Sequence, residues 1–291
     1  MGPQEVLAIM NIVMAGVFGA VIGSFTNVCI YRIPEHRTIV KGHSMCMTCG
    51  HELGALDLVP IFSWLFLGGK CRYCKTPISS RYIKIESLTA LMYILMAATH
   101  LNMFFDPMAP TANILPFLKI CVMFIMINIV IVEMMIMKDT GSSMFVLSAA
   151  LGIDLLVQFL IDVACVFLPQ YASSVTATSA SAFIGGLLVQ VLVGAAIGLV
   201  AVVLAVLFTS KPSDLSKYFS SEKTRAFRTS DLFAIVLCAA IGIIPAIVCA
   251  LVYLIARIAI GNKKSVRLLG AFVAAGAAVG YFGYAAYQLL G

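Results

Sequence analysis

The chain has 291 residues, of which 62% are hydrophobic and only 11% are charged, and its formal net charge is +6. This composition excludes a soluble domain of the same size, which would be far less apolar. The basic residues gather in short stretches between apolar runs, a pattern typical of membrane-protein loops, so the positive charge does not indicate nucleic-acid binding.

Apolar segments long enough to cross a bilayer recur along the chain. They lie at about 6–31, 87–105, 114–133, 144–168, 183–208, 231–260 and 268–290. No Lys or Arg precedes the first, and it is longer than a signal-peptide core, so we interpret it as a span. The run 231–260 is too long for one pass and has Gly242 and Pro245 in its middle, which predicts two short passes.

The sequence thus predicts an all-α polytopic membrane protein with about eight transmembrane helices. Segments 32–86 and 209–230 are rich in Lys and Arg, whereas the loops 106–113 and 169–182 contain neither. The positive-inside rule then places 32–86 in the cytoplasm and both termini outside. We expect a first transmembrane helix at 1–31, a cytoplasmic insert at 32–86 and a membrane domain at 87–291.

The insert contains two Cys-x-x-Cys pairs with 21 residues between them: Cys46 with Cys49, and Cys71 with Cys74. Four thiolates at this spacing are typical of a closed tetrahedral zinc site, which is usually structural. The insert is too small to have much hydrophobic core, so a bound metal would supply folding energy. Two unrelated cysteine pairs, or one redox pair, are the alternative.

The residues around these cysteines resemble those of the type IV prepilin leader peptidase family. The resemblance covers 23–86 and rests on Gly23-Ser24-Phe25-Thr26-Asn27-Val28, Tyr31-Arg32-Ile33-Pro34, Cys46-x-x-Cys49-Gly50-His51, Asp57-x-x-Pro60-Ile61-Phe62-Ser63-Trp64-Leu65, Gly69-Lys70-Cys71-Arg72-Tyr73-Cys74, Pro77-Ile78-Ser79-x-Arg81-Tyr82 and Glu86.

The resemblance implies an aspartic endopeptidase of the bacterial inner membrane. Such an enzyme removes the leader of type IV prepilins or pseudopilins at the cytoplasmic face, with its substrate helix in the lipid bilayer. The resemblance also implies methylation of the new N-terminus with S-adenosylmethionine, for which the sequence has no independent methyl-donor motif.

The resemblance implies two catalytic aspartates, since one carboxylate activates water while its protonated neighbour donates to the carbonyl. At the first position, the end of the third span, this chain has Glu133. At the second, the family pattern Gly-x-Gly-Asp reads Arg228-Thr229-Ser230-Asp231. Asp139 and Asp154 are alternatives for the first carboxylate. The departures leave a second hypothesis open: a catalytically impaired relative that binds pilin-like transmembrane segments as an assembly factor.

Overall fold

The computed structural model describes residues 2–104, 114–167, 180–209, 225–260 and 268–290. These residues form helices and turns, with two isolated β-bridges and no longer strand, so the all-α prediction is confirmed. The loop 106–113 and most of 169–182 and of 209–230 lie outside the described residues. Clustering of contacts divides the chain into two compact units, 1–101 and 102–291. The three-part division expected from the sequence stays a prediction.

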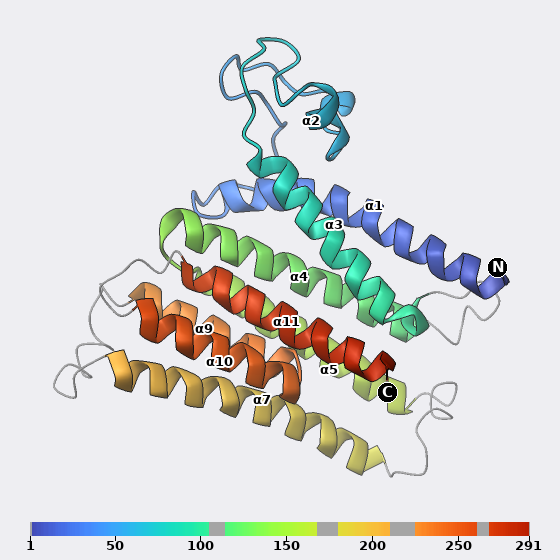
Figure 1. Cartoon of the computed structure of the whole chain (residues 1–291), viewed down its shortest axis with the longest axis vertical. Coiled ribbons are helices and arrows are strands. Elements are labelled where there is room, and N and C mark those ends of the chain that lie inside the picture. Colours follow the sequence, from blue (N-terminus) through green and yellow to red (C-terminus); the bar gives the residue numbers. More distant parts are fainter. Residues whose placement is uncertain (1, 105–113, 168–179, 210–224, 261–267, 291) are drawn as a thin grey trace. The chain divides into compact units, whose positions relative to one another are not determined.

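The first unit is a pair of antiparallel helices that carries the cysteine segment. Helices α1 (Pro3–Arg32) and α3 (Arg81–Thr99) pack together along a row of glycines (Figure 1). A Cβ at Gly19 would lie 2.8 Å from the Cα of Ala90, and one at Gly23 would lie 2.8 Å from the Cα of Glu86. Glycine therefore permits the close backbone approach, a frequent device between membrane helices.

Between these helices, the segment 33–80 has little regular structure. It contains the 3₁₀ turn η1 (Ala55–Asp57) and the short helix α2 (Phe62–Phe66). After α3, a second 3₁₀ turn, η2 (Leu101–Met103), follows.

The second unit is a helical bundle (Figure 1). It consists of α4 (Ile114–Thr140), α5 (Phe145–Phe167), α7 (Ala180–Thr209), α9 (Arg225–Ala240), α10 (Ile243–Ile260) and α11 (Leu269–Leu290). Helix α11 packs against both α4 and α10, and α7 packs against α9 and α10. Small residues again allow close contact: a Cβ at Gly198 would lie 2.9 Å from the Cα of Ile235.

Seven helices of the described part are long and apolar enough to cross a membrane: α1, α3, α4, α5, α7, α10 and α11. The chain is therefore a multi-pass membrane protein. The eighth expected span corresponds to α9, which has 16 residues and is shorter than the other seven. The expected break in the run 231–260 is present, because α9 ends at Ala240 and Gly242 has a φ of +90°. Only glycine adopts such a φ without strain.

A small polar cavity of about 180 Å³ opens beside this break. Gly242, Gln158, Gln190 and Tyr281 are among its lining residues, together with the ion pair of Lys119 and Asp162, whose nitrogen and oxygen are 2.6 Å apart. The cavity lies where α4 and α7 begin and where α5 and α9 end. It is therefore at the opposite end of the bundle from Glu133 and Asp231.

Candidate metal centre and candidate catalytic site

The four predicted cysteines of the insert form one cluster. Their sulfur atoms all lie within 4.8 Å of one another, and the Sγ atoms of Cys46 and Cys74 are 3.8 Å apart. A disulfide would need about 2 Å. Four sulfurs at about 2.3 Å from a tetrahedral zinc ion would be about 3.8 Å from each other, so the geometry fits a metal site.

Both cysteine pairs are held by the same local turn. The backbone N–H of Gly50 donates to the carbonyl of Cys46 at 2.8 Å, and that of Lys75 donates to Cys71 at 3.0 Å. The residue after the second cysteine has a positive φ in each turn, +70° at Gly50 and +62° at Lys75. The two turns therefore have the same backbone structure. Each Cys-x-x-Cys pair directs its two sulfurs to one side of its turn, and the four sulfurs meet in one cluster.

The surroundings shift the pKa values of the Cys49 and Cys74 thiols in opposite directions. A hydrogen bond with the Thr76 hydroxyl is the main cause that lowers the pKa of Cys74 to about 6. The backbone of His51 lowers the pKa of Cys49, but desolvation and the thiols of Cys46 and Cys74 outweigh it and raise this pKa to about 11. A metal ion would have to displace the remaining protons, as is usual for thiolate sites.

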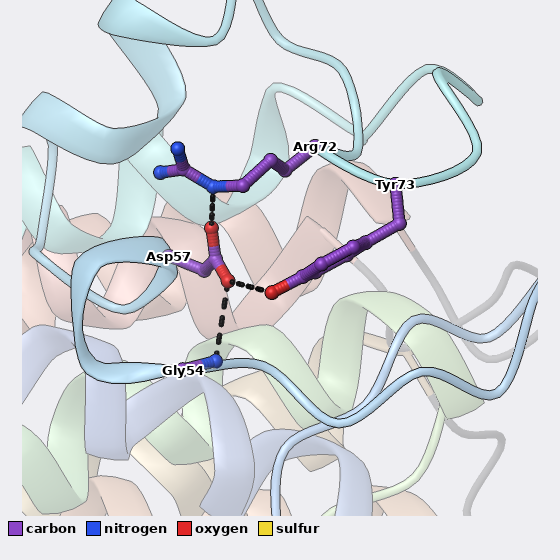
Figure 2. Close-up of polar contacts among 4 residues, drawn as sticks. All are labelled: Gly54, Asp57, Arg72 and Tyr73. Atoms are coloured by element: carbon purple, nitrogen blue, oxygen red, sulfur yellow. Dashed lines mark hydrogen bonds and ion pairs between the residues drawn. The ribbon is translucent and has the colours of Figure 1, made fainter.

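Hydrogen bonds to the Asp57 carboxylate connect the second cysteine turn to the loop before α2 (Figure 2). Its carboxylate accepts hydrogen bonds from the Nε of Arg72 at 2.5 Å, the hydroxyl of Tyr73 at 3.2 Å and the backbone N–H of Gly54 at 3.2 Å. Arg72 is the main cause that lowers the pKa of Asp57, so the carboxylate stays charged at neutral pH. The Tyr73 ring also stacks on His51 at 3.5 Å between centroids, which joins the two cysteine turns.

In the second unit, Glu133 is held by the start of the next helix. Its side chain is almost fully buried in α4 and accepts hydrogen bonds from the Ser143 hydroxyl and from the backbone N–H of Met144. The sequence predicted that the span ends at Glu133, but α4 continues to Thr140 and Gly141, with a φ of +72°, ends it. Glu133 therefore lies two turns inside the helix.

Asp231 is held by two residues of α10. The hydroxyl of Tyr253 donates to its Oδ1, and the Nε of Arg257 lies 3.8 Å from the same oxygen. All three side chains are buried, and Arg257 has no solvent exposure. Attraction between opposite charges is much stronger when water is excluded, so this contact anchors the start of α9 to the end of α10.

Ser143 links the surroundings of the two carboxylates. Its hydroxyl donates to Glu133, and its backbone carbonyl accepts a hydrogen bond of 3.2 Å from the Thr229 hydroxyl, two residues before Asp231. Glu133 and Asp231 are therefore at the same end of the bundle. Thr229 occupies the unrestricted position of the Gly-x-Gly-Asp pattern, between the two residues that replace its glycines.

The two alternative carboxylates have other surroundings. Asp154 is buried in α5 and accepts a hydrogen bond of 2.7 Å from Gln158, one turn further along the same helix. Asp139, expected in a loop, is an exposed residue in the last turn of α4. Glu133 accepts the Ser143 hydrogen bond that leads towards Asp231, so it is the better candidate.

Sequence reasoning missed Ser143, Tyr253 and Arg257. Lys263, Lys264 and Arg267, the basic residues that follow Arg257 in the sequence, lie outside the described part. One signal was available: Tyr253 and Arg257 are four residues apart in an apolar run, so they share one helix face. A buried arginine requires a partner, which here is Asp231.

Residues 17–100, which include the cysteine insert and most of the helix pair, match the family model described as Bacterial Peptidase A24 N-terminal domain. The N-terminal third of the chain is therefore similar to this peptidase domain, and the match does not extend to the second unit.

Curated relatives match over the same part of the chain. The prepilin leader peptidase/N-methyltransferase of Myxococcus xanthus is 46% identical over 77 residues, which are 26% of this chain and 23% of that protein. The proteins of the same name from Dichelobacter nodosus and Aeromonas hydrophila are 32% and 37% identical, over 30% and 28% of this chain and 40% and 37% of their own lengths. The chain thus spans less than half the length of these relatives. No solved structure matches.

Proposed function

We propose that the chain is a membrane endopeptidase that removes the leader from type IV prepilin-like proteins at the cytoplasmic face of the bacterial inner membrane. The observation that carries this proposal is the hydrogen-bonded linkage from Glu133 through Ser143 to Thr229, two residues before Asp231, so that two buried carboxylates from separate helices lie at the same end of the bundle. Hydrolysis of a peptide bond by carboxylates requires such a pair. The relatives of the N-terminal third, named prepilin leader peptidase/N-methyltransferase, support the substrate class.

In this proposal Asp231 and Glu133 have different roles. Arg257 stabilises negative charge beside Asp231, which suits Asp231 as the base that activates water. Glu133 accepts hydrogen bonds from two neutral donors, the Ser143 hydroxyl and the Met144 N–H, which suits it as the acid. Transfer of a methyl group from S-adenosylmethionine is proposed only through the names of the relatives.

Co-expression of the chain with a prepilin tests the proposal. The intact mass of the pilin should fall by the mass of its leader when the native chain is present. An unchanged pilin that nevertheless co-purifies with the chain would favour the second candidate, an assembly factor. That candidate is supported by Arg228 and Ser230, which stand where the family pattern has glycines.

Tyr253→Phe is expected to lower kcat for leader removal by about 10- to 100-fold, because it removes one hydrogen bond to a charged carboxylate. KM should change little, since Tyr253 has no role in holding the pilin. The measurement is a rate series against prepilin concentration. Tyr281→Phe, on α11 beside the polar cavity, is the matched control and should retain the native rate.

We also propose that Cys46, Cys49, Cys71 and Cys74 bind a structural zinc ion. The sulfur separations support this ion, and the four thiolates would complete its coordination. A closed site leaves no position for substrate, so the ion would shape the insert and would not take part in the cleavage.

Asp57→Asn is expected to weaken zinc binding by about 10-fold without abolishing it, because the hydrogen bonds from Arg72 and Tyr73 to Asp57 orient the second cysteine turn. Competition between the purified chain and a colorimetric chelator would measure the change. Glu52→Gln, an exposed acid near the first turn, serves as the control. Equal zinc affinity of Asp57→Asn and the native chain would show that the hydrogen bonds of Asp57 do not contribute to metal binding.

A further inference from the structure

The short helix α2 has two different faces. On the inner face, the indole N–H of Trp64 donates to the carbonyl of Ile78 at 3.2 Å. The Trp64 ring also lies against Gly69, where a Cβ would be 2.8 Å from it. The outer face consists of Phe62, Leu65 and Phe66, with exposed fractions of 57%, 55% and 85%. Trp64 thus fixes α2 to the second cysteine turn, while three large apolar side chains point away from it.

A buried carboxylate holds this apolar face close to a membrane helix. The backbone N–H of Ile61, directly before α2, donates to the Oε2 of Glu86 at 2.7 Å. Glu86 is buried in the second turn of α3, against Gly23 of α1. Ile61 has a φ of +65°, which a β-branched residue adopts only under constraint. The start of α2 is therefore attached within two turns of the point where α3 begins.

The segment around α2 has the charge that an anionic surface attracts. Residues 32–86 contain eight Lys or Arg and four Asp or Glu, an excess of four positive charges. A zinc ion with four thiolates carries a net charge of −2, so an excess of two remains after metal binding. Basic residues beside exposed aromatic and aliphatic side chains are typical of segments that lie in the membrane interface.

We propose that the outer face of α2, formed by Phe62, Leu65 and Phe66, inserts into the boundary between the headgroups and acyl chains of an anionic phospholipid bilayer. The attachment of Ile61 to Glu86 places this face at the membrane entry of α3. Insertion would hold the cysteine insert at the bilayer surface. This inference depends on the first unit alone and stands whether or not the chain is a peptidase.

The chain contains a single tryptophan, Trp64, which reports on α2 without labelling. The zinc-loaded full chain would be reconstituted into vesicles of phosphatidylcholine and phosphatidylglycerol that carry bromine either near the headgroups or near the chain ends. Shallow bromine should quench on the order of half of the Trp64 fluorescence, and deep bromine distinctly less, as expected for an interfacial helix. Iodide in solution should quench weakly.

Two variants and a change of lipid test the origin of the quenching. Phe62→Ser combined with Phe66→Ser should lose most of it while the zinc content is retained. Val40→Ser, which alters an exposed apolar residue of the same segment away from α2, should behave like the native chain. Vesicles without phosphatidylglycerol should give weaker quenching, and equal quenching would contradict the role of the basic residues.

Two results would overturn the proposal. Strong quenching by iodide with none from brominated lipid would show that α2 faces the solution. Protection of Trp64 from both quenchers, unchanged in the double variant, would show that protein covers the face.

Discussion

Asp231→Asn is expected to lower the rate of leader removal on the order of 10²- to 10⁴-fold, because the amide cannot accept a proton from the attacking water. The substitution keeps the size of the side chain, and the Tyr253 hydroxyl can still donate to the amide oxygen. Intact mass of a co-expressed prepilin, followed over time, gives the rate. Asp154→Asn removes a buried carboxylate from the same bundle and should leave the rate unchanged.

Loss of the Asp231 charge also leaves Arg257 buried beside a neutral group, which threatens folding. Glu133→Gln therefore provides an independent test, since the donors to Glu133 are the neutral Ser143 hydroxyl and Met144 N–H, and it should be as inactive as Asp231→Asn. Glu133→Asp should cost about 100-fold, because the shorter side chain withdraws about 1.5 Å from Ser143 and Met144. Faster cleavage by Glu133→Asp than by the native chain would instead mean that glutamate silences the site.

Cys74→Ser is expected to abolish zinc binding and to unfold the cysteine insert. The segment 33–80 has one helix of five residues and no apolar core of its own, so metal coordination must supply its stability. Structural zinc contributes roughly 10–16 kcal/mol in small domains, far above the stability of such a segment without metal. Zinc content by mass spectrometry and limited proteolysis of the purified chain would measure both effects.

Cys121→Ser is the matched control for this experiment, because Cys121 is partly exposed on α4 and far from the cluster in sequence. It should retain the full zinc content and the native cleavage pattern. A strong chelator should convert the native chain to the proteolytic pattern of Cys74→Ser. Resistance of the metal-free chain to protease would contradict the folding role that we assign to the ion.

The cysteine cluster could be predicted from the sequence because its geometry is local. Each Cys-x-x-Cys turn closes over five residues, and a short connection brings the two turns together. The break at Gly242 was predictable for a similar reason. A helix of 30 apolar residues would exceed the bilayer thickness, and glycine permits the backbone conformation that ends a helix.

The surroundings of the carboxylates could not be predicted in this way. The contacts of Asp231 with Tyr253 and Arg257, and of Ser143 with Thr229, join residues 22, 26 and 86 positions apart. They depend on how the helices pack: the spacing of Tyr253 and Arg257 marks one face of α10 but does not show which residue of another helix this face contacts. Family resemblance indicated the carboxylates themselves but not the residues that hold them.

The short length of α9 has a consequence for the electric field in the bilayer. From Asp231 the helix continues for nine residues to Ala240, about 14 Å at 1.5 Å per residue, or about half of the hydrocarbon thickness. Beyond it, Gly242 borders the polar cavity, and non-helical backbone at this depth is tolerated where it lines water. If water connects this cavity to the nearer membrane surface, the membrane potential would fall over about half the usual distance, and the field along α9 would be about twice as steep.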